Sequence, residues 1–267
     1  MMLFAGDTMA PPTTSNGSEP PRPPTREAPA LARRLYQAVT VAVPPDAGSA
    51  FRILLDGKPA RTPAKEGLDL PTRPCAEAVA AEWAAQGEHI DPATMPLTKL
   101  VCSAIDGVRG REGEVREAIG KYVASDLLCY RASSPLPLVC RQTALWDPVL
   151  AWGRDVLGVP LIVTTGVMPV AQPETARTAL ARTLAEQDPF TLAALYVMTS
   201  LMGSALLALA HAHGQLGLEE AWAAAHVDED WQISQWGEDA QAAARREGRW
   251  REVASASRLL RLVSNAP

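Results

Sequence analysis

The polarity of the chain changes character near residue 72. Before it, "RLYQAVTVAV" alternates apolar and polar positions and is rich in β-branched residues, a pattern typical of a half-buried strand. "FRILLDGKPARTPAK" then places Asp56-Gly57 between two extended runs, which predicts a hairpin because glycine accepts the positive φ of the turn. A further extended piece, "GLDLPT", ends at Thr72. We therefore expect a small antiparallel β-rich domain over residues 31–72.

After residue 72 the apolar positions recur near every 3.6 residues, which predicts helices. Thr72 and Pro74 supply a cap and a first-turn proline for "RPCAEAVAAEWAAQGE", and "MPLTKLVCSAIDGV" and "GEVREAIGKYVASDLLCY" continue the helical spacing. Three further helix starts are predicted from a capping residue followed by proline, at Asp147-Pro148, Gln172-Pro173 and Asp188-Pro189. Strands first and helices afterwards predict an α+β fold, with a larger, mostly helical C-terminal domain over residues 73–267.

Two segments do not follow this division. The first 30 residues are dominated by Pro, Ser and Thr, and we expect a disordered tail there. "GVPLIVTTGVMPV" is β-branched and bounded by glycine, which predicts a second, short hairpin over residues 161–170.

One uncharged stretch admits two interpretations. "FTLAALYVMTSLMGSALLALA", residues 190–210, is long enough to cross a bilayer. It also contains Thr and Ser residues and has no basic cluster close to either end. The alternative is a buried, broken helix in which Gly203 ends one piece and Ser204 caps the next.

Composition and charge exclude several partners. The chain has 267 residues, 47% of them hydrophobic, and a formal net charge of -5. No basic helix face with interleaved aromatic residues is present, so nucleic acid is not an expected partner. The four cysteines have no paired spacing and are expected to be reduced thiols. The N-terminus lacks the basic start and apolar core of a secretory signal.

The familiar catalytic and cofactor templates are missing. No GxGxxG or GxxxxGK[ST] motif occurs, the histidines show no metal-ligand spacing, and Ser204 does not lie on a GxSxG elbow. We therefore expect no cofactor and no metal.

The segment "VDEDWQISQWGEDAQAAARREGRW" is the least ordinary part of the chain. It holds three of the 7 tryptophans. On a helix, Trp231 and Trp236 project about 140° apart, too far for one narrow buried stripe. Glu238 and Asp239 come directly after Gly237. An alternative hypothesis is a small hydrolase or transferase that uses these two acids and His226 as its catalytic groups. The competing interpretation is a protein-binding surface of aromatic anchors and selective charges.

Four segments in the same order resemble a known family. They are "AAEWAAQGEHIDPATMPLTKLVCSAIDGV", "YVASDLLCYRA", "WDPVLAW" and "DWQISQWGEDAQA". Together they are similar to the chaperones that assemble the F₁ sector of ATP synthase by guarding its alpha subunit. The match runs from about residue 35 to the last helix. The acids in the tail are unlike a mitochondrial transit peptide, so the chain resembles the bacterial members.

The resemblance implies a non-catalytic protein and a soluble core helix from Phe190. It implies that the chain binds the free alpha subunit and shields its subunit interface until the beta subunit replaces it. We expect a monomer in the bacterial cytoplasm, or in the mitochondrial matrix for a eukaryotic source, without stable membrane insertion. The candidate partner-binding residues are Glu238, Asp239, Trp231, Trp236 and Asp126. Asp126 can alternatively cap a helix.

Overall fold

The computed structural model describes residues 31–44 and 50–264, and the expected tail over residues 1–30 lies outside these ranges. The strands are β1 (Ala32–Arg33), β2 (Val39–Ala42), β3 (Phe51–Leu55), β4 (Lys58–Pro59), β5 (Asp69–Leu70), β6 (His89–Ile90), β7 (Tyr130–Arg131) and β8 (Thr164–Thr165). The α-helices are α1 (Arg73–Ala84), α2 (Pro96–Ser103), α3 (Glu112–Gly120), α4 (Leu136–Trp152), α5 (Glu174–Ala185), α6 (Pro189–Met202), α7 (Ala205–Ala212), α8 (Leu218–Ala225), α9 (Val227–Trp236) and α10 (Ala240–Val263).

Strands β2 to β5 form the antiparallel unit that the sequence predicts, whereas β1 pairs with β6, which follows α1. β3 is central: it pairs with β2, β4 and β5, all antiparallel. Its turn into β4 is Asp56-Gly57, both with positive φ, and the Asp56 carboxylate accepts the backbone N–H groups of Gln37 and Ala38. Because this carboxylate bonds to the segment before β2, the turn also fixes the edge of the sheet.

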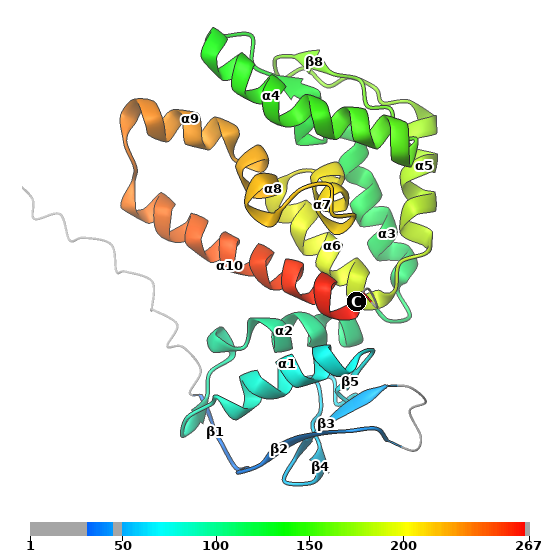
Figure 1. The fold of residues 1–267 in the computed structure, drawn as a ribbon, viewed down its shortest axis with the longest axis vertical. Coiled ribbons are helices and arrows are strands. Elements are labelled where there is room, and N and C mark those ends of the chain that lie inside the picture. Colours follow the sequence, from blue (N-terminus) through cyan, green and yellow to red (C-terminus); the bar gives the residue numbers. More distant parts are fainter. Residues whose placement is uncertain (1–30, 45–49, 265–267) are drawn as a thin grey trace, which may run out of the picture. The chain divides into compact units, whose positions relative to one another are not determined.

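Helix α1 begins where the cap signal places it. The Thr72 hydroxyl accepts the N–H of Cys75 and donates to the carbonyl of Leu262 near the end of α10. The helix packs on β2 and β3 with one face and contacts α2 and α10 with the others (Figure 1). The apolar core is therefore continuous from the sheet into the helices, and it runs from Ile53 to Leu260.

Helix α6 is the centre of the helical part and contacts α2, α3, α7 and α10. A helix that is apolar on all sides needs partners all round, which explains the uncharged stretch. Gly203, in the left-handed region at φ 69°, ends α6, and the Ser204 hydroxyl accepts the N–H of Leu207 at the start of α7. No helix within the described ranges combines the length and apolarity that a bilayer crossing requires.

One of the three predicted proline starts is wrong, and a second is displaced by one residue. Asp188 does cap α6, with Pro189 in its first turn. Pro148, however, lies inside α4, where it leaves the carbonyl of Ala144 without its helical donor. The helix continues because the neighbouring Trp146 is fully buried and donates its indole N–H to the carbonyl of Ala224 in α8, at 2.7 Å.

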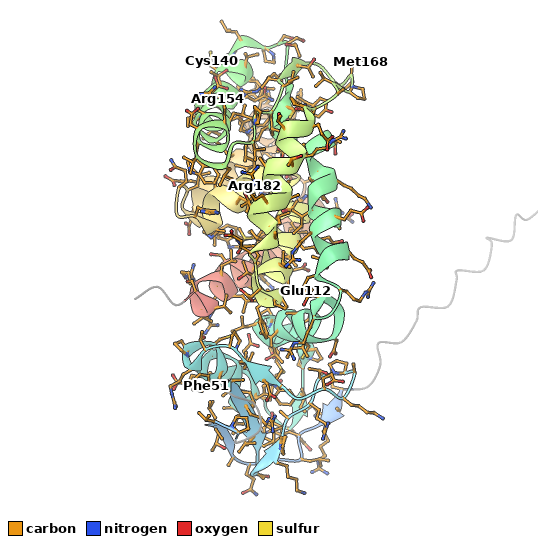
Figure 2. All side chains as sticks on the ribbon, turned by 90° about the vertical axis from the view of Figure 1, so that its right-hand side faces the viewer. Phe51, Glu112, Cys140, Arg154, Met168 and Arg182 are labelled. Carbon is orange, nitrogen blue, oxygen red and sulfur yellow. The ribbon has the colours of Figure 1, made fainter. Side chains whose placement is uncertain are left out.

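The start predicted at Gln172-Pro173 lies one residue too early, and the second hairpin is wrong; the Gln172 side chain accounts for both differences. α5 begins at Glu174 with Pro173 as its N-cap residue, and Gln172 does not cap the helix. The Gln172 side chain accepts the N–H of Ile162 and donates to its carbonyl, as a paired strand would. β8, which is only two residues long, pairs in parallel with β7, so residues 161–170 contain one short strand and no hairpin. Met168, in the exposed segment after β8, is labelled in Figure 2.

Candidate functional site

The tryptophan-rich segment forms a hairpin of two helices. α9 ends at Trp236, Gly237 to Asp239 make the turn, and α10 returns toward the core (Figure 1). Gly237 has φ 85° and ψ 175°, a combination that is essentially restricted to glycine. The turn can therefore be tight without an extended loop.

Charged pairs hold the two helices of this hairpin together. Arg246 contacts Asp230 at 2.5 Å, and Arg249 contacts Glu229 at 3.2 Å. On the other side of α9, Gln142 of α4 donates to Asp228 at 2.7 Å. Gln142 is 1% exposed and also accepts the N–H of Ala132. The acidic start of α9 is thus occupied within the fold.

The two indoles of α9 have separate environments. Trp231 is half-buried, and the guanidinium of Arg141 in α4 lies 4.9 Å from its ring centroid. Trp236 is 80% exposed. An indole with this much exposed surface buries little apolar area within the fold. It offers a large, rigid contact area to another molecule. The 140° separation therefore assigns one indole to the fold and one to the surface.

The two adjacent acids of the turn, Glu238 and Asp239, also differ in their bonding. Asp239 caps α10, because its carboxylate accepts the N–H of Ala242 at 2.7 Å. Glu238 is exposed and has no hydrogen bond or ion pair with any residue that the structure describes. A surface hollow of about 260 Å³ lies beside it, with Trp236 and Arg246 on its walls. Glu238 and Trp236 are thus available at the same edge.

Asp126, the fifth sequence candidate, is not on this surface. It is 1% exposed, and its carboxylate accepts the N–H groups of Leu128 and Leu206. It therefore caps the short turn at Leu127–Cys129 and also the start of α7, as the alternative interpretation expects. Burial raises the pKa of Asp126 to about 6, while hydrogen bonds from Ser204 and the backbone partly offset that rise. The assignment of Asp126 as a partner-contact residue is therefore wrong, because its carboxylate is buried.

The acids of the turn and His226 do not form a catalytic arrangement. His226 is 5% exposed, its Nδ1 lies 2.9 Å from the carbonyl of Trp222, and its ring stacks on that indole at 3.8 Å. Desolvation lowers the pKa of His226. It precedes α9, whereas Glu238 follows it, so the ten residues of α9 separate them by about 15 Å. Within residues 31–44 and 50–264, no three His, Cys, Asp or Glu side chains group as a metal site.

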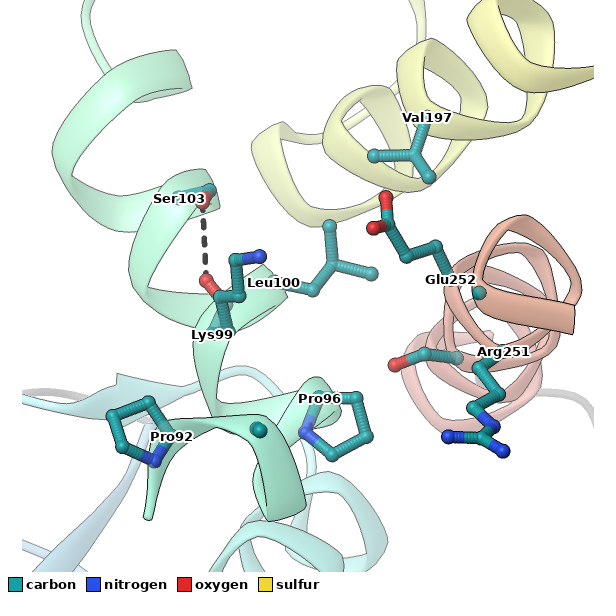
Figure 3. Close-up of a pocket in the computed structure, with 11 residues that line it drawn as sticks. Pro92, Pro96, Lys99, Leu100, Ser103, Val197, Arg251 and Glu252 are labelled. Carbon is teal, nitrogen blue, oxygen red and sulfur yellow. Dashed lines mark hydrogen bonds between the residues drawn. The ribbon is translucent and has the colours of Figure 1, made fainter. Parts of the chain in front are cut away.

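A second surface feature was missed from the sequence. A hollow of about 280 Å³ lies between α2 and α10, with Pro96, Lys99 and Leu100 on one side and Gly248 and Glu252 on the other (Figure 3). The available signal was Gly248 itself, because glycine is unfavourable in the interior of a helix as long as α10.

Comparison with known proteins agrees with the fold and with the sequence motifs. The family model described as ATP12 chaperone protein matches residues 33–154. A crystal structure of an Agrobacterium tumefaciens protein described as a candidate chaperone is similar with a TM-score of 0.83 and 49% identity, covering 88% of this chain and 87% of that one. Atp12 from Paracoccus denitrificans gives a TM-score of 0.82 and 38% identity, covering 87% of this chain and 98% of that one.

A Paracoccus denitrificans Atp12p mutant in which lysine replaces an aspartate matches with the same values. These comparisons confirm the family resemblance and the predicted α+β class, with small antiparallel sheets near the N-terminus and most helices after them.

Proposed function

The chain belongs to the ATP12 chaperone family, and from that premise we propose that it assists assembly of the F₁ sector of ATP synthase. In this proposal it binds the free alpha subunit and covers the subunit interface that the beta subunit later occupies. The observation that carries the contact site is the exposed indole of Trp236 beside the unpaired carboxylate of Glu238.

An unassembled ring subunit presents an apolar interface, and such surfaces aggregate when they are left open. An aromatic anchor beside a charge suits a reversible cover for that interface. The indole supplies buried area, and the carboxylate selects an arginine or lysine on the client. Their positions on a hairpin fixed by ion pairs reduce the entropy lost on binding.

Release requires no nucleotide hydrolysis by this chain. The contact with the chaperone competes with self-association of the client, and the larger permanent contact with the beta subunit displaces it. We propose accordingly that the chain acts without cofactor or catalysis, as a monomer, in the bacterial cytoplasm. For a eukaryotic source the corresponding compartment is the mitochondrial matrix.

Co-expression with the alpha subunit of the same organism tests the function. We expect alpha to become soluble only when this chain is present, and the two proteins to elute together on a sizing column. If alpha is equally insoluble with and without the chain, and no complex elutes, the proposed function is wrong.

Three variants test the contact site. Trp236→Ala and Glu238→Lys should each reduce the amount of alpha recovered in the complex while leaving thermal stability unchanged, because both side chains are exposed. Glu186→Lys is the matched charge reversal, since Glu186 is an exposed acid at the end of α5, on the opposite side of the view from α9 (Figure 1). If Glu238→Lys behaves like Glu186→Lys, Glu238 is not part of the contact.

A further inference from the structure

Gly248 is costly for the fold that contains it. It lies in the interior of the 24-residue helix α10, where glycine is less favourable than alanine. A Cβ atom built at this position would meet nothing within 4 Å. No close packing inside the chain therefore requires glycine here. Gly248 lines the hollow between α2 and α10, and it also borders a neighbouring surface depression beside Glu229 and Arg249.

The floor of the hollow is apolar and contains one unsatisfied polar group. Leu100 of α2 and Val197 of α6 supply apolar surface (Figure 3). Ser255 lines the same hollow and is 8% exposed, and its hydroxyl has no hydrogen-bond partner in the part of the chain that the structure describes. A buried hydroxyl without a partner is unfavourable, and rotation about χ1 reorients it toward an incoming group.

The two walls carry opposite charges that are free to bind. Lys99 projects from α2 and Glu252 from α10 toward the space between these helices (Figure 3). Neither side chain forms an ion pair with another described residue, whereas the adjacent Arg251 is paired with Glu247 at 2.9 Å. The hollow therefore offers an acceptor on one side and a donor on the other.

A second hollow lies next to the first, with residues of α2 between them. This second hollow, of about 670 Å³, shares Pro92, Lys99 and Ser103 with the first and extends to Arg61 and Trp83. We call these two adjacent hollows together the trough. A surface with a donor, an acceptor and an apolar floor is complementary to an extended polypeptide. Backbone N–H groups can donate to Glu252, and carbonyls can accept from Lys99 and Ser255, where the missing Cβ of Gly248 allows close approach.

We propose that this trough binds an extended segment of the client polypeptide, as a second contact beside the α9–α10 turn. The inference rests on the proposed function for the identity of the client, the free alpha subunit. The same helix carries both contacts, because Asp239 starts α10 and Gly248 lies nine positions further along it. A client that reaches both would be held along one rigid element.

Substitutions at Gly248 separate fold stability from client binding. Gly248→Ala should raise the melting temperature by about 2–4 °C, because alanine favours the helix and meets no neighbour. The same variant should weaken binding of the alpha subunit about fivefold, and Gly248→Leu about a hundredfold, because the added side chain fills the trough. Gly113→Ala is the matched control, since Gly113 is an exposed glycine of α3 whose Cβ also meets nothing.

The measurements are the melting temperature of each purified variant and a titration of its complex with the alpha subunit, with light scattering for mass. If wild type binds alpha, Trp236→Ala weakens the complex and both Gly248 variants bind like Gly113→Ala, the trough inference is overturned while the function stands. If wild type does not bind the alpha subunit, both the proposed function and the trough inference are wrong. A wild-type dimer that Gly248→Leu dissociates would assign the trough to a second copy of this chain and overturn the proposal.

Discussion

Asp126 gives the fold a pH-dependent stability that one substitution should remove. The carboxyl is 1% exposed, and burial raises its pKa from 3.8 to about 6. A pKa raised on folding means that the native state favours the protonated form. The stabilising contribution is therefore complete below pH 3.8 and is lost as the pH rises through about 6.

The size of this effect follows from the shift. A pKa raised from 3.8 to about 6 corresponds to about 3 kcal/mol of unfolding free energy. About 2 kcal/mol of this falls between roughly pH 4.5 and pH 7.5, because the unfolded carboxyl is already mostly ionised at the lower value. Asp126→Asn cannot ionise, so its stability should lack this contribution while its altered hydrogen bonds add a constant cost.

Urea unfolding of both proteins at the two pH values measures the effect. The stability of wild type minus that of Asp126→Asn should fall by about 2 kcal/mol between the lower and the higher pH. All other titrating groups contribute equally to both proteins and cancel in this difference. A difference that is the same at both pH values, or that rises with pH, would refute the assignment of Asp126 as a carboxyl that is neutral at low pH and strained when ionised.

Four more substitutions test the local roles by urea unfolding. Asp239→Ala should lower stability by about 1 kcal/mol through loss of the α10 cap, whereas Glu238→Ala should change it by less than about 0.5 kcal/mol; equal effects would contradict the division between them. Gly203→Ala should cost about 1 kcal/mol, because φ is 69° there, and a stabilised variant would contradict this. Gln142→Ala should cost about 2 kcal/mol or more by leaving the N–H of Ala132 unsatisfied, and a neutral result would show that the two bonds of its amide contribute nothing.

Local signals predicted the parts of the fold in which neighbours along the chain decide the conformation. The Asp56-Gly57 turn, the Thr72 cap and the break at Gly203-Ser204 are each set by backbone geometry and a hydrogen bond within a few residues. The α+β class followed from the same evidence, because the strand signals end where the helix signals begin. The boundary between the two predicted domains, at residues 72 and 73, stays a prediction.

The errors lie where contacts distant in sequence outweigh the local signal. Pro148 reads as a helix start, yet burial of Trp146 against α8 keeps α4 continuous through it. Gln172 reads as a cap, yet its amide pairs with the backbone of Ile162. Neither partner could be inferred from spacing, because the pairing depends on how the helices pack. The parallel register of β8 with β7 has the same origin.

The candidate site shows the same limit at the level of single residues. The sequence placed Trp231 and Trp236 on different faces, but only the position of α4 determines which indole is covered. The trough was missed because Lys99 and Gly248 come from helices more than a hundred residues apart in the sequence. Gly248 within a helical pattern was the one local sign of the trough, and a glycine alone does not indicate which helix packs opposite it.

The acids of the last two helices fall into two groups, those paired within the fold and those left unpaired. Most of them are paired within the fold. Asp228 bonds to Gln142, Glu229 and Asp230 pair with arginines of α10, Glu247 pairs with Arg251, and Asp239 caps its own helix. Among the described residues of this region, the side chains of Glu238 and Glu252 form no such hydrogen bond or ion pair. One lies beside the exposed indole of Trp236 and the other on the wall of the trough. A client that brings a cation to either position gains a pair without breaking one, which is the arrangement that favours a reversible contact.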